Sequence, residues 1–236
     1  MPSIKGLIRR TYNGFNKARA RALIPGMLVT ANNPPRLELL GDGEGAWTVP
    51  VDLIKPGWIC YCVGVGVDAT FDLALVERCG AEVYSLDPTP RAISYIEELA
   101  IKDPRHHFVP IAVWSTNTTL KFYEPMNLSH VNLSTRDIHG TNSFVTVEAE
   151  TLKTLKKRLG TPDIDLLKID IEGSWDEVIN NMVEDSIIPK VLCVEFDTPT
   201  SPAKLKRAVQ QLDTLGLKPI HQMRDNVLFL REDLIN

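Results

Sequence analysis

The chain has 236 residues, of which 44% are hydrophobic, and its charged side chains give a formal net charge of −4. This is enough apolar material for one sizeable core, so a single main domain is expected. The charge balance lacks the basic excess of a broad nucleic-acid-binding face. No apolar run reaches the ~20 residues of a membrane span. We therefore expect no nucleic-acid partner and no membrane span.

The four cysteines predict reduced, mostly buried thiols. None of them forms a CxxC pair, and three lie in apolar segments of strand length, which makes a metal site built on them improbable. Reduced thiols are typical of the cytoplasm, where we place the protein. These residues are Cys60, Cys62, Cys79 and Cys193.

Residues 1–24 predict a basic helix, because Ile4, Ile8 and Phe15 recur at helical spacing. We expect it to pack on the domain or on a second subunit, and contact with a membrane surface or an acidic partner is the alternative. Residues 25–50 are rich in Pro and Gly, which indicates an irregular lead-in with one or two short strands, such as 36–40. We divide the chain into this lead-in, 1–35, and the main domain, 36–236.

From Trp58 onward, apolar segments of strand length alternate with helical patterns. Gly80 is predicted to end the first helix of this series, and Thr89 with Pro90 to begin the second. The predicted strands are 59–63, 82–86, 107–113, 166–169 and 191–194. The predicted helices are 69–79, 89–101, 151–159, one beginning with a capping box at 174–177, and one beginning at 201–202.

Residues 114–150 interrupt this alternation. Short strands are predicted at 120–123 and 143–147, with a polar loop at 127–142 between them. The loop is interpreted either as a plain surface insertion or as a segment that covers the substrate, since long loops on rigid scaffolds often determine specificity.

The last two predicted strands, 218–223 and 227–231, are joined by a tight turn and must therefore pair antiparallel. Strands that alternate with helices predict a parallel sheet covered on both faces. The fold class is therefore α/β, with a mostly parallel seven-stranded sheet that ends in an antiparallel hairpin. This arrangement resembles the Rossmann-like methyltransferase fold.

The first strand of the series runs into Gly64, Val65 and Gly66, where glycines allow a tight turn and the close approach of a ligand. Asp87 closes the second strand, where a carboxylate can accept hydrogen bonds from a ribose; capping of the next helix is the structural alternative. The loose glycine pattern with Asp87 suits NAD or S-adenosylmethionine equally.

Asp68 helps to separate these two ligands. It lies at the N-terminus of the first helix of the series, where a pyrophosphate would otherwise bind. A carboxylate there repels phosphate but is compatible with the ammonium and sulfonium groups of S-adenosylmethionine. Asp68 therefore favours S-adenosylmethionine, with a simple helix cap as the alternative.

Two further carboxylates, Asp170 and Glu172, follow the strand 166–169 at its carboxyl end. Such ends border the crevice in which open α/β sheets bind ligands, and charges there are costly unless used or paired. We predict Asp170 and Glu172 as catalytic. The structural alternatives are capping of the next helix or pairing with Lys168.

At this point the chain resembles the FkbM family of methyltransferases. The resemblance rests on Leu167-Lys168-Ile169-Asp170-Ile171-Glu172-Gly173 and covers roughly residues 36–231. Further matching segments are 45–50, 64–68, 71–75, 87–90 and 194–196. The family implies transfer of a methyl group from S-adenosylmethionine to oxygen, usually to a hydroxyl of a sugar or secondary metabolite, so the expected partner is a small hydroxylated acceptor.

The chain departs from the commoner family pattern at Cys62, Ser174-Trp175 and Asp197. These departures keep open a non-catalytic cofactor-binding module, and the glycine pattern keeps open an NAD-dependent oxidoreductase. A homo-oligomer is compatible with the sequence.

The cofactor-binding residues are predicted at the turns that follow four of the strands. Residues 64–68 are expected to hold the methionine part, Asp87 the ribose, and 111–113 the adenine. A histidine, His130, His139 or His221, is a candidate assistant base. Glu195 and Asp197 could join the catalytic carboxylates around Mg²⁺, but no spacing demands a metal. The predicted cofactor-binding residues are Gly64, Val65, Gly66, Asp68, Asp87, Pro88, Ala112 and Asp170.

Overall fold

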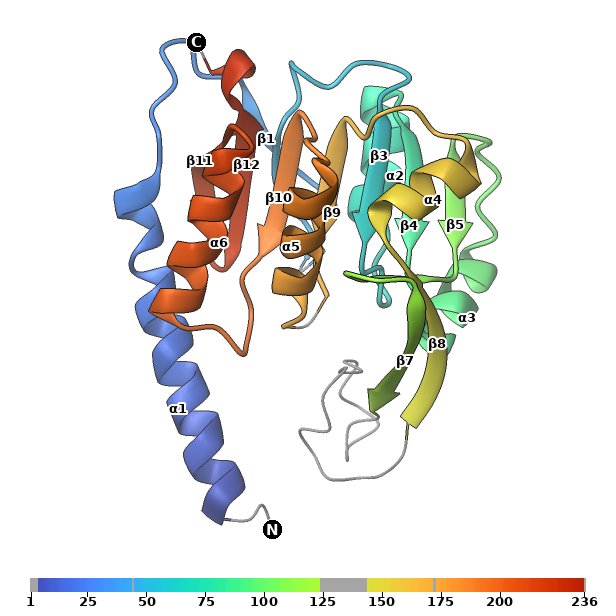
Figure 1. Ribbon diagram of the computed structural model, residues 1–236. Coiled ribbons are helices and arrows are strands. Elements are labelled where there is room, and N and C mark those ends of the chain that lie inside the picture. The colour runs from blue at the N-terminus through green and yellow to red at the C-terminus, as the bar shows by residue number, and fades with distance from the viewer. Residues whose placement is uncertain (1–3, 44, 124–143, 172, 236) are drawn as a thin grey trace.

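A computed structural model describes residues 4–43, 45–123, 144–171 and 173–235, and Figure 1 shows its elements. The helices are α1 (Ile4–Arg21), α2 (Thr70–Cys79), α3 (Pro90–Leu99), α4 (Leu152–Leu159), α5 (Trp175–Asp185) and α6 (Pro202–Thr214), with short 3-10 turns η1 (Ile24–Met27) and η2 (Glu232–Leu234). The strands are β1 (Leu37–Leu40), β2 (Trp47–Pro50), β3 (Ile59–Val63), β4 (Glu82–Leu86), β5 (His106–Val109), β6 (Ala112–Val113), β7 (Thr118–Tyr123), β8 (Phe144–Glu150), β9 (Leu166–Ile169), β10 (Val191–Glu195), β11 (Leu217–Met223) and β12 (Asn226–Arg231).

The main sheet has seven strands in the order β11-β12-β10-β9-β3-β4-β5. The five strands from β10 to β5 run parallel, and β12 pairs antiparallel with both β10 and β11. The predicted fold, a mostly parallel sheet ending in an antiparallel hairpin, is confirmed. The parallel strands all end at one edge, the carboxyl edge of the sheet.

Both faces of the sheet are covered, because side chains alternate along each strand. In β3, Ile59, Tyr61 and Val63 pack toward α4, α5 and α6, whereas Cys60 and Cys62 pack toward α2 and the β1-β2 ribbon. All five residues of β3 are buried. Burial of each large apolar side chain contributes roughly 1.5–3 kcal/mol.

Side chains and glycines define the helix ends largely as predicted. The hydroxyls of Thr89, Thr151 and Ser201 accept hydrogen bonds from the first turns of α3, α4 and α6. Gly80 ends α2 in the left-handed conformation with φ of 68°. The predicted capping box at 174–177 is wrong: α5 begins there, but Ser174 makes no capping hydrogen bond through its side chain.

The predicted strand 107–113 is also corrected, because it is two strands in two different sheets. Pro110 has no backbone N–H, so it cannot continue the ladder of β5. The chain turns there, and β6 joins a second sheet with the order β6-β8-β7. Ala112, Val147 and Ala149 of this sheet form a small apolar cluster of their own, whereas Val113 belongs to the main core.

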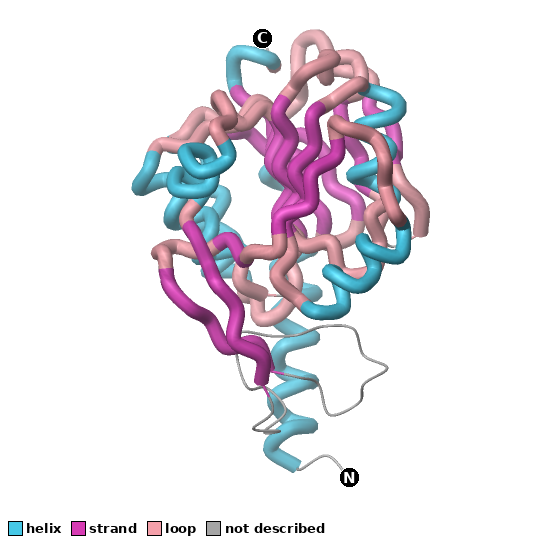
Figure 2. Tube along the Cα trace, turned by 90° about the vertical axis from the view of Figure 1, so that its right-hand side faces the viewer, coloured by secondary structure: helices cyan, strands magenta, loops and turns pink. Residues whose placement is uncertain are grey.

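Two parts extend beyond the carboxyl edge of the main sheet. Figures 1 and 2 show the β7-β8 hairpin and α1 projecting past the same end of the domain. The predicted loop 127–142 lies outside the described residues. No helix among the described ranges is long and apolar enough to cross a membrane.

Candidate active site

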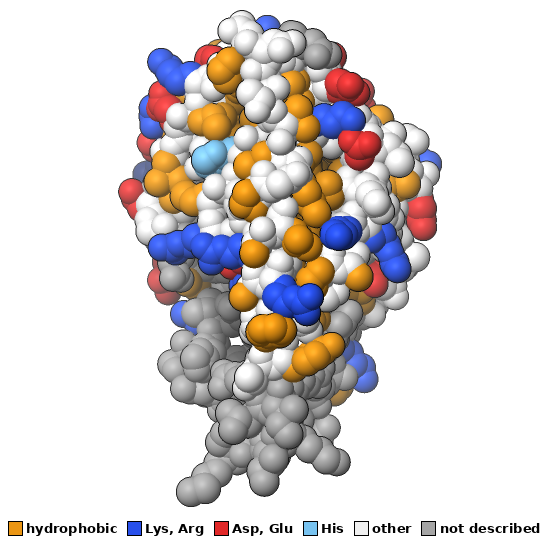
Figure 3. Space-filling view, turned by 90° about the vertical axis from the view of Figure 1, so that its left-hand side faces the viewer, with side chains coloured by type: hydrophobic (Ala, Val, Ile, Leu, Met, Phe, Trp, Pro, Cys, Tyr) orange, Lys and Arg blue, Asp and Glu red, His pale blue; other side chains and the backbone are white. Residues whose placement is uncertain are grey.

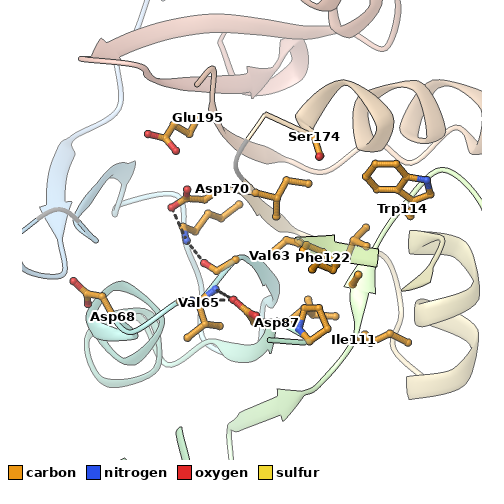
Figure 4. A pocket seen from close by; sticks show the side chains of 18 of the residues that line it. Val63, Val65, Asp68, Asp87, Ile111, Trp114, Phe122, Asp170, Ser174 and Glu195 are labelled. Atoms are coloured by element: carbon orange, nitrogen blue, oxygen red, sulfur yellow. Dashed lines mark hydrogen bonds and ion pairs between the residues drawn. The ribbon is translucent and has the colours of Figure 1, made fainter. Parts of the chain in front are cut away.

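A cavity of about 340 Å³ lies at the carboxyl edge of the main sheet. Its volume falls in the range of roughly 300–1,000 Å³ that is usual for small-molecule sites. Residues from the ends of β3, β4, β9 and β10 meet residues from β6 and β7 around it (Figure 4). The described residues lining it are Gly45, Val63, Gly64, Val65, Gly66, Val67, Asp68, Leu86, Asp87, Pro88, Ile111, Ala112, Val113, Trp114, Phe122, Lys168, Asp170, Ile171, Ser174 and Glu195.

The turn after β3 forms the floor of the cavity and requires glycine at position 64. Gly64 has φ of 90°, and a Cβ atom there would overlap the backbone carbonyl oxygen of Asp170. The Gly64 N–H donates to the carbonyl of Leu86 at 2.9 Å. The turn is therefore held between the ends of β4 and β9.

The Asp87 carboxylate holds this glycine turn in place. One carboxylate oxygen accepts hydrogen bonds from the N–H groups of Val65 and Gly66 at 3.0 and 2.9 Å. The other accepts from the N–H and hydroxyl of Thr89 at 2.8 and 2.6 Å. Four hydrogen bonds use the acceptor capacity of a carboxylate. Asp87 thus joins two turns of the cavity, and Thr89, not Asp87, caps α3.

Asp68 lies at the N-terminal end of α2. Its carboxylate accepts hydrogen bonds from the N–H of Thr70 at 2.9 Å and from the Thr70 hydroxyl at 2.6 Å. The N-cap residue of α2 is Ala69, without a capping side chain, so Asp68 bonds the first residue of the helix but is not its cap, and it also lines the cavity. A carboxylate at this helix end occupies the place of an anion-binding site.

Asp170 forms an ion pair with Lys168, whose Nζ lies 3.1 Å from the Asp170 carboxylate. The same ammonium donates to the carbonyl of Gly64 at 2.7 Å. Only 5% of the Lys168 side chain is exposed. Burial by itself would lower the pKa of Lys168. The nearby carboxylates of Asp170 and Asp72 have the larger, opposite effect, so the pKa of Lys168 lies above its ordinary value. Lys168 is therefore a permanent cation beneath the cavity.

A buried polar chain continues beneath Lys168. Asp72, from α2, is 2% exposed and accepts a hydrogen bond from the Ser85 hydroxyl. Burial raises the pKa of Asp72, while the nearby Lys168 ammonium and the Ser85 hydroxyl lower it in part. Cys62, the position at which the resemblance to the FkbM family implies an Asp, adjoins this carboxyl. Asp72 thus places a buried carboxylate next to the position of that missing Asp.

His106 ends this polar chain, with its Nε2 2.9 Å from the Ser85 hydroxyl oxygen. The Ser85 hydroxyl has one proton, which it donates to Asp72, so Nε2 of His106 must be the donor to Ser85. Burial lowers the pKa of His106, and the neighbouring His107 lowers it further.

The opposite wall of the cavity is apolar and aromatic. Trp114 and Phe122 lie on the side away from Asp68, with Asp170 between the two walls (Figure 4). Ser174, which directly precedes α5, and Glu195, the last residue of β10, also line the cavity. Sequence reasoning missed Trp114, Phe122 and Lys168 as site residues. For Lys168 the signal was present, namely one charge inside an apolar strand.

All the predicted cofactor-binding residues line this one cavity, and their role stays a prediction. Glu172, His130 and His139 lie outside the described residues. His221 lies in β11 and is not among the lining residues, so its candidacy as a base at this cavity is wrong. The described parts of the chain contain no group of three or more His, Cys, Asp or Glu side chains that could hold a metal ion.

Comparison with known proteins gives one family and a set of distant structures. No curated protein sequence matches the chain. The solved structures include fibrillarin from Methanococcus jannaschii, with 10% identity, TM-score 0.43 and 87% of each chain covered. They also include fibrillarin from Aeropyrum pernix with bound S-adenosyl-L-methionine, with 12% identity, TM-score 0.43, and 88% of this chain and 85% of that chain covered. We draw no functional argument from likenesses this distant.

Comparison with models of protein families identifies one family. The model of the methyltransferase FkbM domain matches residues 61–215, about two thirds of the chain. The matched range begins in β3 and ends just after α6, so it includes every parallel strand of the main sheet. The chain therefore belongs to the FkbM methyltransferase family, and its cofactor is S-adenosylmethionine.

Proposed function

We propose that the chain methylates a hydroxyl oxygen of a small acceptor, a sugar or a secondary metabolite. The observation that carries this proposal is the position of Asp170, between the carboxylate-bearing wall of the cavity and the aromatic wall formed by Trp114 and Phe122. An acceptor held against the aromatic wall would bring a hydroxyl group to the Asp170 carboxylate. Aromatic side chains offer apolar faces that suit the C–H faces of a sugar ring.

The charges of the cavity suit the cofactor. Among its described lining residues, Lys168 is the single Lys or Arg, whereas Asp68, Asp87, Asp170 and Glu195 are acidic. S-adenosylmethionine supplies a methyl group on a positively charged sulfonium and also carries an ammonium. We place its methionine part along Gly64–Asp68 and its adenine against Ala112 and the adjoining apolar residues.

Asp87 would serve the ribose only by exchanging protein hydrogen bonds for bonds to the ribose hydroxyls, since its four acceptor sites are already used. Its N–H partners would then turn toward the bound cofactor. Asp87 therefore couples the glycine turn to occupancy of the cavity.

Asp170 and Glu172 are the candidates for handling the acceptor proton. The Asp170 carboxylate is held in place by the Lys168 ammonium, 3.1 Å away. We assign Asp170 the orientation of the acceptor hydroxyl, so that one oxygen lone pair points at the methyl group. Glu172 is assigned the removal of its proton.

Calorimetric titration with S-adenosylmethionine, S-adenosylhomocysteine and NAD tests the cofactor assignment, and a screen of hydroxylated sugars and metabolites tests the acceptor class. Transfer of labelled methyl to a hydroxyl, lost in Glu172→Gln and reduced in Asp170→Asn with cofactor affinity retained, supports the proposal. Cofactor binding without transfer to any hydroxylated acceptor would instead favour a non-catalytic module.

A further inference from the structure

Helix α1 packs on the domain with its polar side and presents aromatic side chains to solvent. Ala20 is 1% exposed, and Asn13 and Lys17 are half-buried against the domain. On the opposite side, Tyr12 is 66% exposed and Phe15 61%. An amphipathic helix that served only to cover a core would be oriented the other way. The apolar side of α1 is therefore available for a partner.

This orientation is fixed by contacts at the C-terminal half of α1. Lys17 forms an ion pair with Asp225, in the β11-β12 turn, at 2.9 Å. The Gln222 side chain donates to the carbonyl of Arg21 at 3.3 Å. Ala20 and the following Ile24 belong to the main core. Rotation of α1 to bury Tyr12 and Phe15 would break all of these contacts.

The N-terminal segment that includes α1, residues 1–37, carries a net charge opposite in sign to that of the rest of the chain. Residues 1–37 contain seven Lys or Arg and no Asp or Glu. The other 199 residues contain 19 Lys or Arg and all 30 Asp and Glu, so the two parts carry formal charges of +7 and −11. Figure 3 shows Lys and Arg side chains beside hydrophobic ones on the face that carries α1.

Basic and aromatic groups are interleaved on this surface. The Arg19 guanidinium lies 5.6 Å from the centre of the Phe15 ring. Beside α1, a shallow groove is lined by Lys17, Arg21 and Arg224. Asp225, which pairs with Lys17, is the one carboxylate among the described residues of this groove. The groove thus keeps an excess of positive charge next to the exposed rings.

We propose that the solvent-facing side of α1, with the groove beside it, binds the surface of an anionic lipid membrane. Exposed aromatic rings flanked by Arg on a helix are the pattern that lies in the interfacial plane of a bilayer, with the rings at the headgroup level. Anionic lipids attract each basic residue near the surface. A second copy fits less well, because two such helices would bring like charges together.

Flotation of the full chain with lipid vesicles tests the proposal without reference to methyl transfer. We expect binding to vesicles of phosphatidylcholine with about one third phosphatidylglycerol, and none to phosphatidylcholine alone. Raising NaCl from ~0.1 M to ~1 M shortens the Debye length from ~10 Å to ~3 Å and should release the protein. Failure of the intact chain to float with the anionic vesicles would overturn the proposal.

Two variants and their matched controls locate the surface. Tyr12→Ser with Phe15→Ser should abolish flotation, and Arg19→Gln with Arg21→Gln should weaken partitioning about 30-fold. The controls, Val29→Ser with Leu39→Ser and Arg91→Gln with Lys102→Gln, change exposed residues elsewhere. Thermal unfolding confirms that each variant is folded. Equal flotation of the variants and the controls would contradict the proposed membrane contact. A dimer or an RNA complex that depends on Tyr12 and Phe15, found without vesicle binding, would also contradict it.

Discussion

Gly64 and Asp170 meet backbone to backbone beneath the cavity, and a side chain at Gly64 would overlap the Asp170 carbonyl oxygen. The turn after β3 therefore packs directly against the backbone that follows β9. Lys168 reinforces this contact, because it binds both the Gly64 carbonyl and the Asp170 carboxylate. The part of the cavity assigned to the cofactor and the residue assigned to the acceptor are thus joined at one point.

Gly64→Ala is expected to lower the free energy of unfolding by about 3 kcal/mol or more, because the strained φ and the overlap with Asp170 add. Urea denaturation measures this change. Gly160→Ala is the control, since Gly160 also has a positive φ, 67°, but has open space around it. Its expected cost is only about 1 kcal/mol. Equal losses in the two variants would show that the backbone contact does not matter.

Lys168→Met should destabilise the fold by about 3–5 kcal/mol, because it leaves Asp72 and Asp170 without their buried counter-charge. The free energy of unfolding near neutral pH is the measurement. Lys190→Met is the matched control: Lys190 pairs with Asp165, but its side chain is 34% exposed, so a loss of at most about 1 kcal/mol is expected. A Lys168 variant as stable as this control would contradict the assignment.

Stability should fall as the pH drops below 6.5, in part because of His106. Its folded pKa is lowered from 6.5 by burial, so the unfolded chain binds a proton that the folded chain does not, and this favours unfolding. Well above 6.5 the residue is neutral in both states and contributes no slope. His106→Gln should reduce the slope measured by denaturation at a series of pH values. An unchanged slope would show that His106 is not the group responsible.

Asp87→Asn should weaken binding of S-adenosylmethionine about 10- to 100-fold, because the amide cannot accept from both the glycine turn and Thr89. Calorimetry measures the dissociation constant. Asp103→Asn, which removes a carboxylate from a surface pair with Arg105, is the control and should leave binding unchanged. A change below about threefold in Asp87→Asn would count against the role proposed for this carboxylate.

The sequence predicts the elements of the main sheet well because each strand is a short apolar run bounded by a glycine, a carboxylate or a cap. The ranges 59–63, 82–86 and 166–169 agree with β3, β4 and β9. It fails where a distant residue decides the local structure. Glu177, expected to complete a capping box, instead accepts a hydrogen bond from Ser115, 62 residues earlier in the chain.

The residues of the candidate site likewise fall into those that the sequence predicts and those that it does not. Gly64, Asp87 and Asp170 are found from sequence because each follows a strand, where the carboxyl edge of the sheet gathers side chains. The partners of Lys168 are not visible in the sequence, since Gly64 lies 104 residues away and Asp72 is on a helix that the fold alone brings near. Trp114 and Phe122 are missed because Trp114 directly follows, and Phe122 lies in, a strand of the second sheet.

That second sheet has its own small apolar cluster, separate from the two large ones that hold the main sheet. Val113 of β6 belongs to the main core, whereas Val147 and Ala149 of β8 pack in the small cluster. Ala112, Trp114 and Phe122, which lie in or beside the described strands of this sheet, line the cavity, while the glycine turn and Asp87 lie at the carboxyl edge of the main sheet. Substitutions in this small cluster should therefore reshape the aromatic wall of the cavity and leave the glycine turn in place.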